Sequence, residues 1–163
     1  DLAAALDAAL PNGLDVLAAT EAEGTPLAER IDASEWRIEL PGISPDELRC
    51  AVVAVEAADA VVVERVTPSG RRQVDVRGAL VGVIVSAPGS TSAPDTTDCA
   101  IITAVVRQTT PAVRPDDVLG ALDVVAGLKL PAPAKATRMA QGLLDDRGRL
   151  TDPLGPDRVT TRT

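Results

Sequence analysis

Four arginines lie close together in the middle of the 163-residue chain, and they are its side chains best suited to binding an anion. They surround a turn at residues 67–70 that contains Pro and Gly: Arg65, Arg71, Arg72 and Arg77. The β-rich runs at 61–66 and 73–76 predict a hairpin on either side of this turn. A hairpin can carry such arginines to the phosphates of a nucleic acid.

A charged, soluble hairpin is the alternative interpretation, because Glu64 and Asp75 lie within the same stretch. No aromatic residue lies nearby to stack on a base, so a platform of the RNA-recognition type is not supported. Arg114, in the connector before a later helix, completes the set of candidate partner-binding or RNA-binding residues.

Two pairs of neighbouring carboxylates resemble sites for metal binding or acid–base work. Adjacent helical residues diverge by about 100°, so Asp116 and Asp117 do not converge on one ligand, and favourable helix-start electrostatics explains them. Asp145 and Asp146 lie in a segment that contains Gly, where a solvated turn is the expected structure. Neither pair is predicted to be a catalytic dyad.

The residue types that the chain lacks exclude several chemistries. There is no His, the usual general base near neutral pH and a common metal ligand. Cys50 and Cys99 are too few for a zinc or iron–sulfur site and have no His to activate them, so buried packing is expected for both. No glycine pattern for a nucleotide is present. We expect no catalytic residue, no bound metal, no cofactor and no enzyme activity from these residues.

The charge is −8 overall, with 16 Lys and Arg against 24 Asp and Glu, which argues against general polyanion binding and against DNA. Only residues 135–163 are net basic, at +2, against −10 for the first 134 residues. No signal peptide and no apolar run of spanning length is visible. We therefore expect a cytoplasmic protein with reduced thiols and no membrane contact.

Alternating polar and apolar side chains at residues 35–40 predict a half-buried strand that ends at Pro41. Ser44, Pro45 and Glu47 supply an N-cap, a proline at the first helical position and a capping-box partner, so a helix begins at Pro45. Its outer side is also mostly apolar, which reflects either an Ala-rich composition or cover by a partner or a missing segment.

Further along the chain, apolar runs at 80–85 and 99–106 predict two more strands, and residues 115–127 predict a second helix that begins with Pro115 and ends at Gly127. The remaining regions of the chain are less regular. Residues 1–10 predict a helix and 14–17 a brief strand, 87–98 a loop, and 136–144 a short helix.

The order of elements predicts an α+β fold: a ferredoxin-like sandwich of a mostly antiparallel sheet with two main helices, compatible with half of a duplicated arrangement. Residues 29–127 form the predicted domain. Residues 1–28 are interpreted as the remnant of a truncated N-terminal half, and residues 128–163 as a Pro-rich, mostly irregular basic tail.

Several stretches together carry a family resemblance: ALDAALPNGLDVL, ASEWRIELPGISPDELR, ERVTPSGRRQVDVR, AVVRQTTPAVRPDDVLGAL, RMAQGLLD and DPLGPDR. The chain resembles the uncharacterised radical-SAM-linked, or radical SAM-associated, protein family in its actinobacterial form. The most specific parts of the resemblance are residues 34–40 and 113–122. Members of that family usually begin earlier, with a basic, aromatic and His-containing segment that this sequence lacks.

The resemblance implies a partner more than an activity, since family members occur fused to, or encoded alongside, radical SAM enzymes. Our first hypothesis is a non-catalytic accessory or substrate-presenting domain for such an enzyme. The alternative is an RNA-binding module, or an RNA-processing protein when the missing segment is present.

Overall fold

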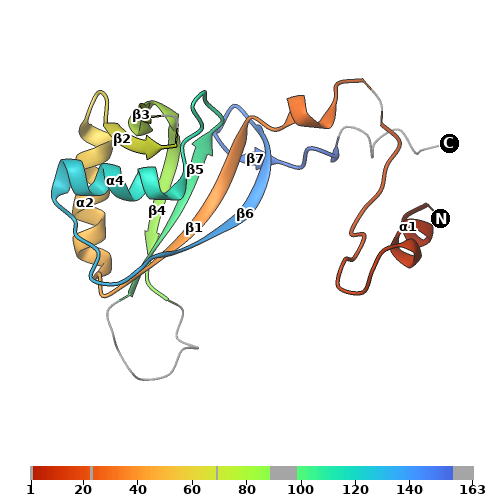
Figure 1. Ribbon diagram of the computed structural model, residues 1–163, viewed down its shortest axis with the longest axis horizontal. Helices are drawn as coiled ribbons and strands as arrows, with labels where there is room; N and C mark the ends of the chain where they lie inside the picture. The colour runs from red at the N-terminus through yellow and green to blue at the C-terminus, as the bar shows by residue number, and fades with distance from the viewer. Residues whose placement is uncertain (1, 23, 69, 89–98, 156–163) are drawn as a thin grey trace.

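A five-stranded antiparallel sheet forms the centre of the computed structural model, which describes residues 2–22, 24–68, 70–88 and 99–155. Figure 1 shows that these strands form a twisted and curved sheet. Their order across the sheet is β4 (Leu80–Ser86), β5 (Cys99–Arg107), β1 (Ala33–Pro41), β6 (Lys135–Leu144) and β7 (Leu150–Thr151). Every neighbouring pair is antiparallel.

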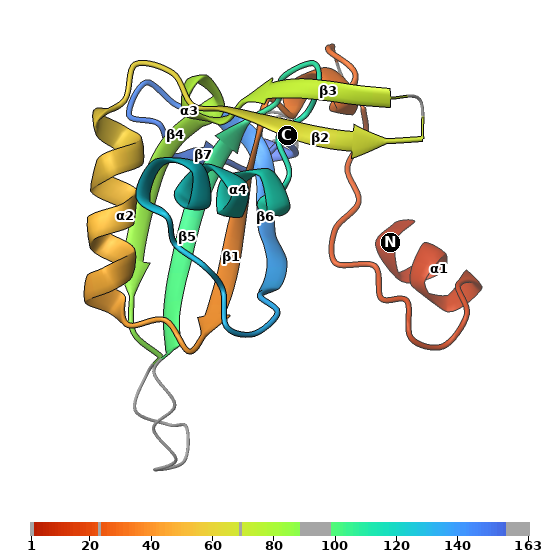
Figure 2. The same cartoon turned by 60° about the vertical axis from the view of Figure 1, so that its left-hand side comes forward.

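Two helices, α2 (Pro45–Ala57) and α4 (Pro115–Ala126), lie on the same side of the sheet (Figure 2). Along the chain the elements follow the order β1, α2, β4, β5, α4 and β6, and β1 lies between β5 and β6 in space. This chain order and this strand order are those of a ferredoxin-like sandwich. The predicted α+β class is therefore confirmed.

The burial of side chains on strand β1 explains why polar and apolar residues alternate at positions 35–40. Ile38 and Leu40 are fully buried in the core between the sheet and the helices. Ile38 lies opposite Ile102 on β5, which is also fully buried, so the centre of the core is aliphatic. The intervening Arg37 and Glu39 point to the other face of the sheet and form an ion pair there.

Both main helices begin where the sequence predicts. The Ser44 hydroxyl accepts a hydrogen bond from the backbone N–H of Glu47 at 3.2 Å, which caps α2. Helix α4 starts at Pro115 and ends at Gly127, whose φ of 67° is in the left-handed region that glycine favours. The outer side of α2 is open to solvent, with Val53 62% exposed.

The predicted hairpin is also confirmed and consists of β2 (Val62–Thr67) and β3 (Gly70–Asp75). It forms a separate two-stranded sheet that extends beyond the end of α4 (Figure 2). Val63 and Val74 are buried at its base, and the short helix α3 (Val76–Ala79) connects it to β4. The hairpin is thus an insertion between the first helix and the second strand of the sandwich.

Two secondary-structure predictions are wrong. Residues 136–144 are not a helix but most of the strand β6, which pairs with β1. An available strand edge on β1 outweighs the weak helical pattern of this segment. Residues 14–17 form no strand, although α1 (Leu2–Ala9) is helical as predicted and has no buried residue.

Between α1 and β1, the described residues include a 3-10 helix, η1 (Leu27–Arg30). Most of the predicted loop at 87–98 lies outside the described residues. Within the described ranges, none of the helices has the length and apolar character needed to cross a membrane.

Candidate functional sites

The candidate arginines do not form one patch, and Arg65 is used within the fold. Its Nε donates to Asp117 Oδ1 at 3.0 Å, and its Nη2 donates to Asp117 Oδ2 and to the carbonyl oxygen of Ala112, the latter at 2.8 Å. The Arg65 side chain is 16% exposed and that of Asp117 5%. This two-pronged ion pair fixes the hairpin to the start of α4.

Asp117 has a second role at the same place, because its Oδ2 accepts the backbone N–H of Arg114 at 2.7 Å. The carboxylate therefore satisfies a donor at the helix N-terminus as well as the guanidinium. Asp116, by contrast, is exposed. The two neighbouring carboxylates have different environments and do not form a shared site.

The remaining candidate arginines differ in how far they are engaged. Arg71 forms an exposed ion pair with Glu64 at 2.9 Å, and Arg77 Nε donates to the carbonyl oxygen of Glu56 at 3.2 Å. Arg72, which lies opposite Arg65 in the hairpin, is exposed, as is Arg114. Neither of these last two side chains has a polar partner in the part of the chain that the structure describes.

A hollow of about 360 Å³ lies between the hairpin and the start of α4. Two of the candidate arginines line it, Arg65 and Arg114, but Asp116 and Asp117 line it as well. The four charges cancel, so this hollow offers little attraction for a polyanion.

The predicted turn at Asp145 is confirmed, with the carboxylate as its centre. Asp145 Oδ1 accepts the backbone N–H groups of Arg147 at 2.9 Å and Arg149 at 2.8 Å, and Oδ2 accepts from the Arg149 guanidinium at 3.0 Å. The backbone hydrogen bond from Arg149 is the main reason that the pKa of Asp145 lies below its ordinary value. Asp146 is exposed.

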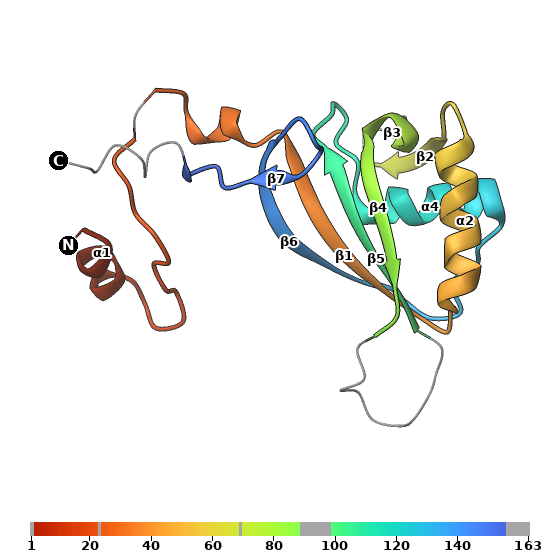
Figure 3. The same ribbon diagram turned by 180° about the vertical axis from the view of Figure 1, so that it is seen from behind.

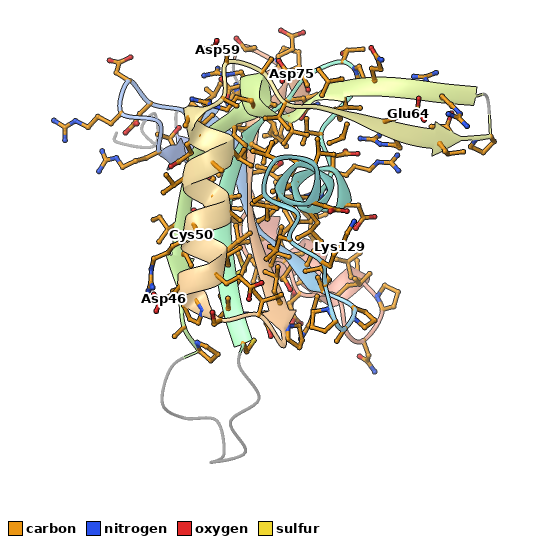
Figure 4. The ribbon with its side chains drawn as sticks, turned by 90° about the vertical axis from the view of Figure 1, so that its left-hand side faces the viewer. Asp46, Cys50, Asp59, Glu64, Asp75 and Lys129 are labelled. Atoms are coloured by element: carbon orange, nitrogen blue, oxygen red, sulfur yellow. The ribbon has the colours of Figure 1, made fainter. Side chains whose placement is uncertain are left out.

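The two cysteines are both free and do not meet. Cys50 is exposed on α2, so the prediction that it would be buried is wrong, and Cys99, at the start of β5, is half-buried. Figure 4 shows Cys50 on the middle of α2, away from the hairpin that carries Glu64. Among the described residues, no group of three or more Cys, Asp or Glu side chains is placed to hold a metal ion.

Sequence reasoning missed a cationic site, a pocket of about 270 Å³ on the helix-bearing side of the sheet that we call the Trp36 pocket. Strands β1, β5 and β6 and the segment before α4 provide its walls. Its polar and aromatic lining consists of Ser34, Trp36, Arg107, Gln108, Arg138 and Gln141, and none of the described carboxylates lines it.

A chain of contacts holds the Trp36 pocket together. The Arg138 guanidinium carbon lies 4.6 Å from the centre of the Trp36 ring, which is a cation–π arrangement. Arg138 Nη1 donates to Gln141 Oε1 at 3.2 Å, and Gln141 Nε2 donates to Ser34 Oγ at 3.3 Å. Arg107 is exposed, and its side chain has no polar partner within the described ranges.

A third hollow, of about 530 Å³, lies on the face of the sheet opposite the two main helices. Figure 3 shows both helices on the other side of the strands. Its lining includes Ile84, Thr103, Val105, Ala140 and Leu150, with Glu35 and Arg149 as its charged residues. Ile84 is 67% exposed, so this face presents apolar surface to solvent.

The architecture defines the chain as an α+β domain with a single helix-covered sheet face. The sequence profile of the DUF2344 family, described as an uncharacterized protein conserved in bacteria, matches residues 1–115. The chain therefore belongs to this family. Neither a search of curated proteins nor a search of solved structures found a match.

Proposed function

We propose that this chain is a cytoplasmic, non-catalytic accessory or substrate-presenting domain that works with a radical SAM enzyme. The observation that carries the proposal is the open sheet face, where Ile84 is 67% exposed beside a hollow of about 530 Å³. Exposed apolar surface of this kind is typical of protein interaction sites. The sequence resemblance described above supplies the class of partner.

The polar groups of the domain also favour a binding role for the chain over a catalytic role. The buried carboxylate of Asp117 is engaged by Arg65 and by the start of α4, and Asp145 organises a turn. The chain contains no His that could take up a proton near neutral pH. Its own residues therefore suit a supporting role beside an enzyme that brings the reactive group.

RNA binding is the second candidate, and one observation favours it. Arg72 and Arg114 are exposed and have no side-chain partner among the described residues. Their neighbours weaken the case, because Arg65 and Arg71 are paired with Asp117 and Glu64. Guanidiniums that are already neutralised contribute less to phosphate binding.

The test uses the full chain and the purified radical SAM protein encoded alongside a family member, with the dissociation constant measured by calorimetry. We expect Ile84→Glu to weaken binding by about tenfold or more, because it places a charge in the apolar interface. Val124→Glu is the matched control, since Val124 on α4 is also 67% exposed but lies on the helix layer. It should change the affinity by less than about twofold.

Equal binding by the Ile84 and Val124 variants, with both folded by circular dichroism, would contradict the assignment of the open sheet face. A parallel titration with an RNA oligonucleotide between about 50 and 200 mM salt addresses the second candidate. RNA affinity that falls steeply with salt and is lost in Arg72→Glu, without binding of the radical SAM protein, would replace the accessory role by RNA binding.

A further inference from the structure

We propose that the Trp36 pocket is a binding site for the phosphate group of a small phosphorylated molecule. This inference does not depend on the accessory role, because it rests on different residues and on the other side of the sheet. Three features carry it: the charge of the pocket, the way its arginines are held, and its size.

The charge of the pocket is opposite to that of the chain. Arg107 and Arg138 line it with no carboxylate from the described part of the chain, whereas the protein as a whole carries −8. Several other arginines in the described structure do face a carboxylate, as Arg65 faces Asp117 and Arg149 faces Asp145. Two guanidiniums match the charge of a phosphate monoester near neutral pH and offer forked donors to its oxygens.

Arg138 is held in place before any ligand arrives. The Trp36 ring lies 4.6 Å from its guanidinium carbon, and Gln141 accepts one of its N–H groups at 3.2 Å. Ser34 in turn holds Gln141 through a hydrogen bond of 3.3 Å. A donor that is already fixed loses less side-chain entropy on binding, which favours affinity. Arg107 adds a second donor that no described side chain engages.

The dimensions and lining of the pocket indicate the kind of ligand. Its volume of about 270 Å³ lies near the lower end of small-molecule sites. Val106 and Val113 add apolar wall beside the Trp36 ring, and Gln108 adds an amide. Such a site accommodates a phosphate group together with a short organic portion against the apolar wall.

Tryptophan fluorescence gives a direct test, because Trp36 is the only Trp and the chain has no Tyr or Phe. The full chain is titrated with ribose 5-phosphate, with ribose, with inorganic phosphate and with a short RNA oligonucleotide, and each titration is repeated by calorimetry. We expect saturable binding of ribose 5-phosphate and no binding of ribose. Inorganic phosphate should compete with ribose 5-phosphate, since the phosphate is the recognised group.

Arg107→Gln should raise the dissociation constant for ribose 5-phosphate by about tenfold or more, because it removes a charged donor. The control is Arg147→Gln, which removes an exposed arginine from a turn outside the pocket and should leave the affinity unchanged. Binding of the RNA oligonucleotide alone, lost in Arg107→Gln, would identify the source of the phosphate as RNA and overturn the small-molecule assignment.

Three other results would overturn the proposal. The first is the absence of binding of any phosphate compound at millimolar concentration by both methods. The second is equal binding of ribose and ribose 5-phosphate. The third is unchanged affinity in Arg107→Gln, with the variant folded by circular dichroism.

Discussion

The hairpin and the Trp36 pocket both contain arginines, but they differ in what those arginines face. In the hairpin, Arg65 lies against the buried Asp117 and Arg71 lies against Glu64. In the pocket, Arg138 lies against an aromatic ring and an amide, and Arg107 has no polar partner in the described part of the chain. The difference shows that a cluster of arginines in the sequence does not by itself make a cationic surface.

The reason lies in where the carboxylates come from. Glu64 belongs to the hairpin itself, and Asp117 comes from the helix against which the hairpin packs. Two of the four hairpin arginines, Arg65 and Arg71, are therefore neutralised where they lie. The arginines of the Trp36 pocket lie on β5 and β6, and the fold brings them together beside a wall to which no described carboxylate contributes.

The largest loss of stability is expected when the carboxylate that anchors the hairpin is removed. We expect Asp117→Ala to lower the free energy of unfolding by about 3 kcal/mol, because it leaves the half-buried guanidinium of Arg65 without its counter-charge. It also removes the acceptor for the N–H of Arg114. Urea unfolding followed by circular dichroism measures the change.

The neighbouring Asp116 supplies the control for this prediction. It is exposed and forms no ion pair among the described residues, so Asp116→Ala should cost less than about 1 kcal/mol. Similar losses for the two variants would show that helix-start electrostatics, and not the pair with Arg65, accounts for the effect of Asp117.

The second prediction concerns the Trp36 pocket, and its expected loss of stability is smaller. Arg138→Met removes the cation from the Trp36 ring but keeps the length of the side chain. We expect the free energy of unfolding to fall by less than about 1 kcal/mol, as is usual for an exposed cation–π contact. The emission of Trp36 should change, because the group that lies over its ring is replaced.

Lys135→Met, on the same strand but outside the pocket, is the control and should leave the emission as it is. An unchanged spectrum in Arg138→Met would show that the stacking of Arg138 on Trp36 is not kept in solution. A loss of stability as large as that in Asp117→Ala would mean that Arg138, like Arg65, has a structural role.

The sequence predicted correctly those helices and strands whose own residues contain a clear local pattern. The alternation at 35–40, the capping residues Ser44 and Glu47, and Pro115 at the start of α4 each specify local structure before any tertiary contact forms. Together with the apolar runs at 80–85 and 99–106, these signals indicated β1, α2, β4, β5 and α4, but not the last strand of the sandwich, β6. The hairpin followed from its Pro- and Gly-containing turn.

The strand β6 could not be predicted in the same way. Its residues have no strict alternation, and the pairing with β1 that makes it a strand involves residues about a hundred positions away, such as Ser34 and Gln141. The Trp36 pocket was missed for the same reason, since Arg138 reaches Trp36 only when β6 lies beside β1. The local cluster of hairpin arginines was visible in the sequence, but the pairing of Arg65 with Asp117 was not.

The third prediction adds a further guanidinium–carboxylate contact to the comparison, the turn in which Asp145 faces Arg149. Backbone hydrogen bonding from Arg149 holds the pKa of Asp145 below its ordinary value, so the folded state favours the ionised carboxylate. The stabilisation is present above the ordinary pKa of the group and is lost as the pH falls through the lower, folded-state pKa. In Asp145→Asn the urea midpoint should therefore fall less steeply than in the parent protein between about pH 5 and about pH 2.

Asp146→Asn, which alters the exposed neighbour, is the control and should keep the parent profile. A parent-like acid profile in Asp145→Asn would show that this carboxylate does not contribute to the pH dependence, and that the turn depends on its backbone geometry more than on its charge.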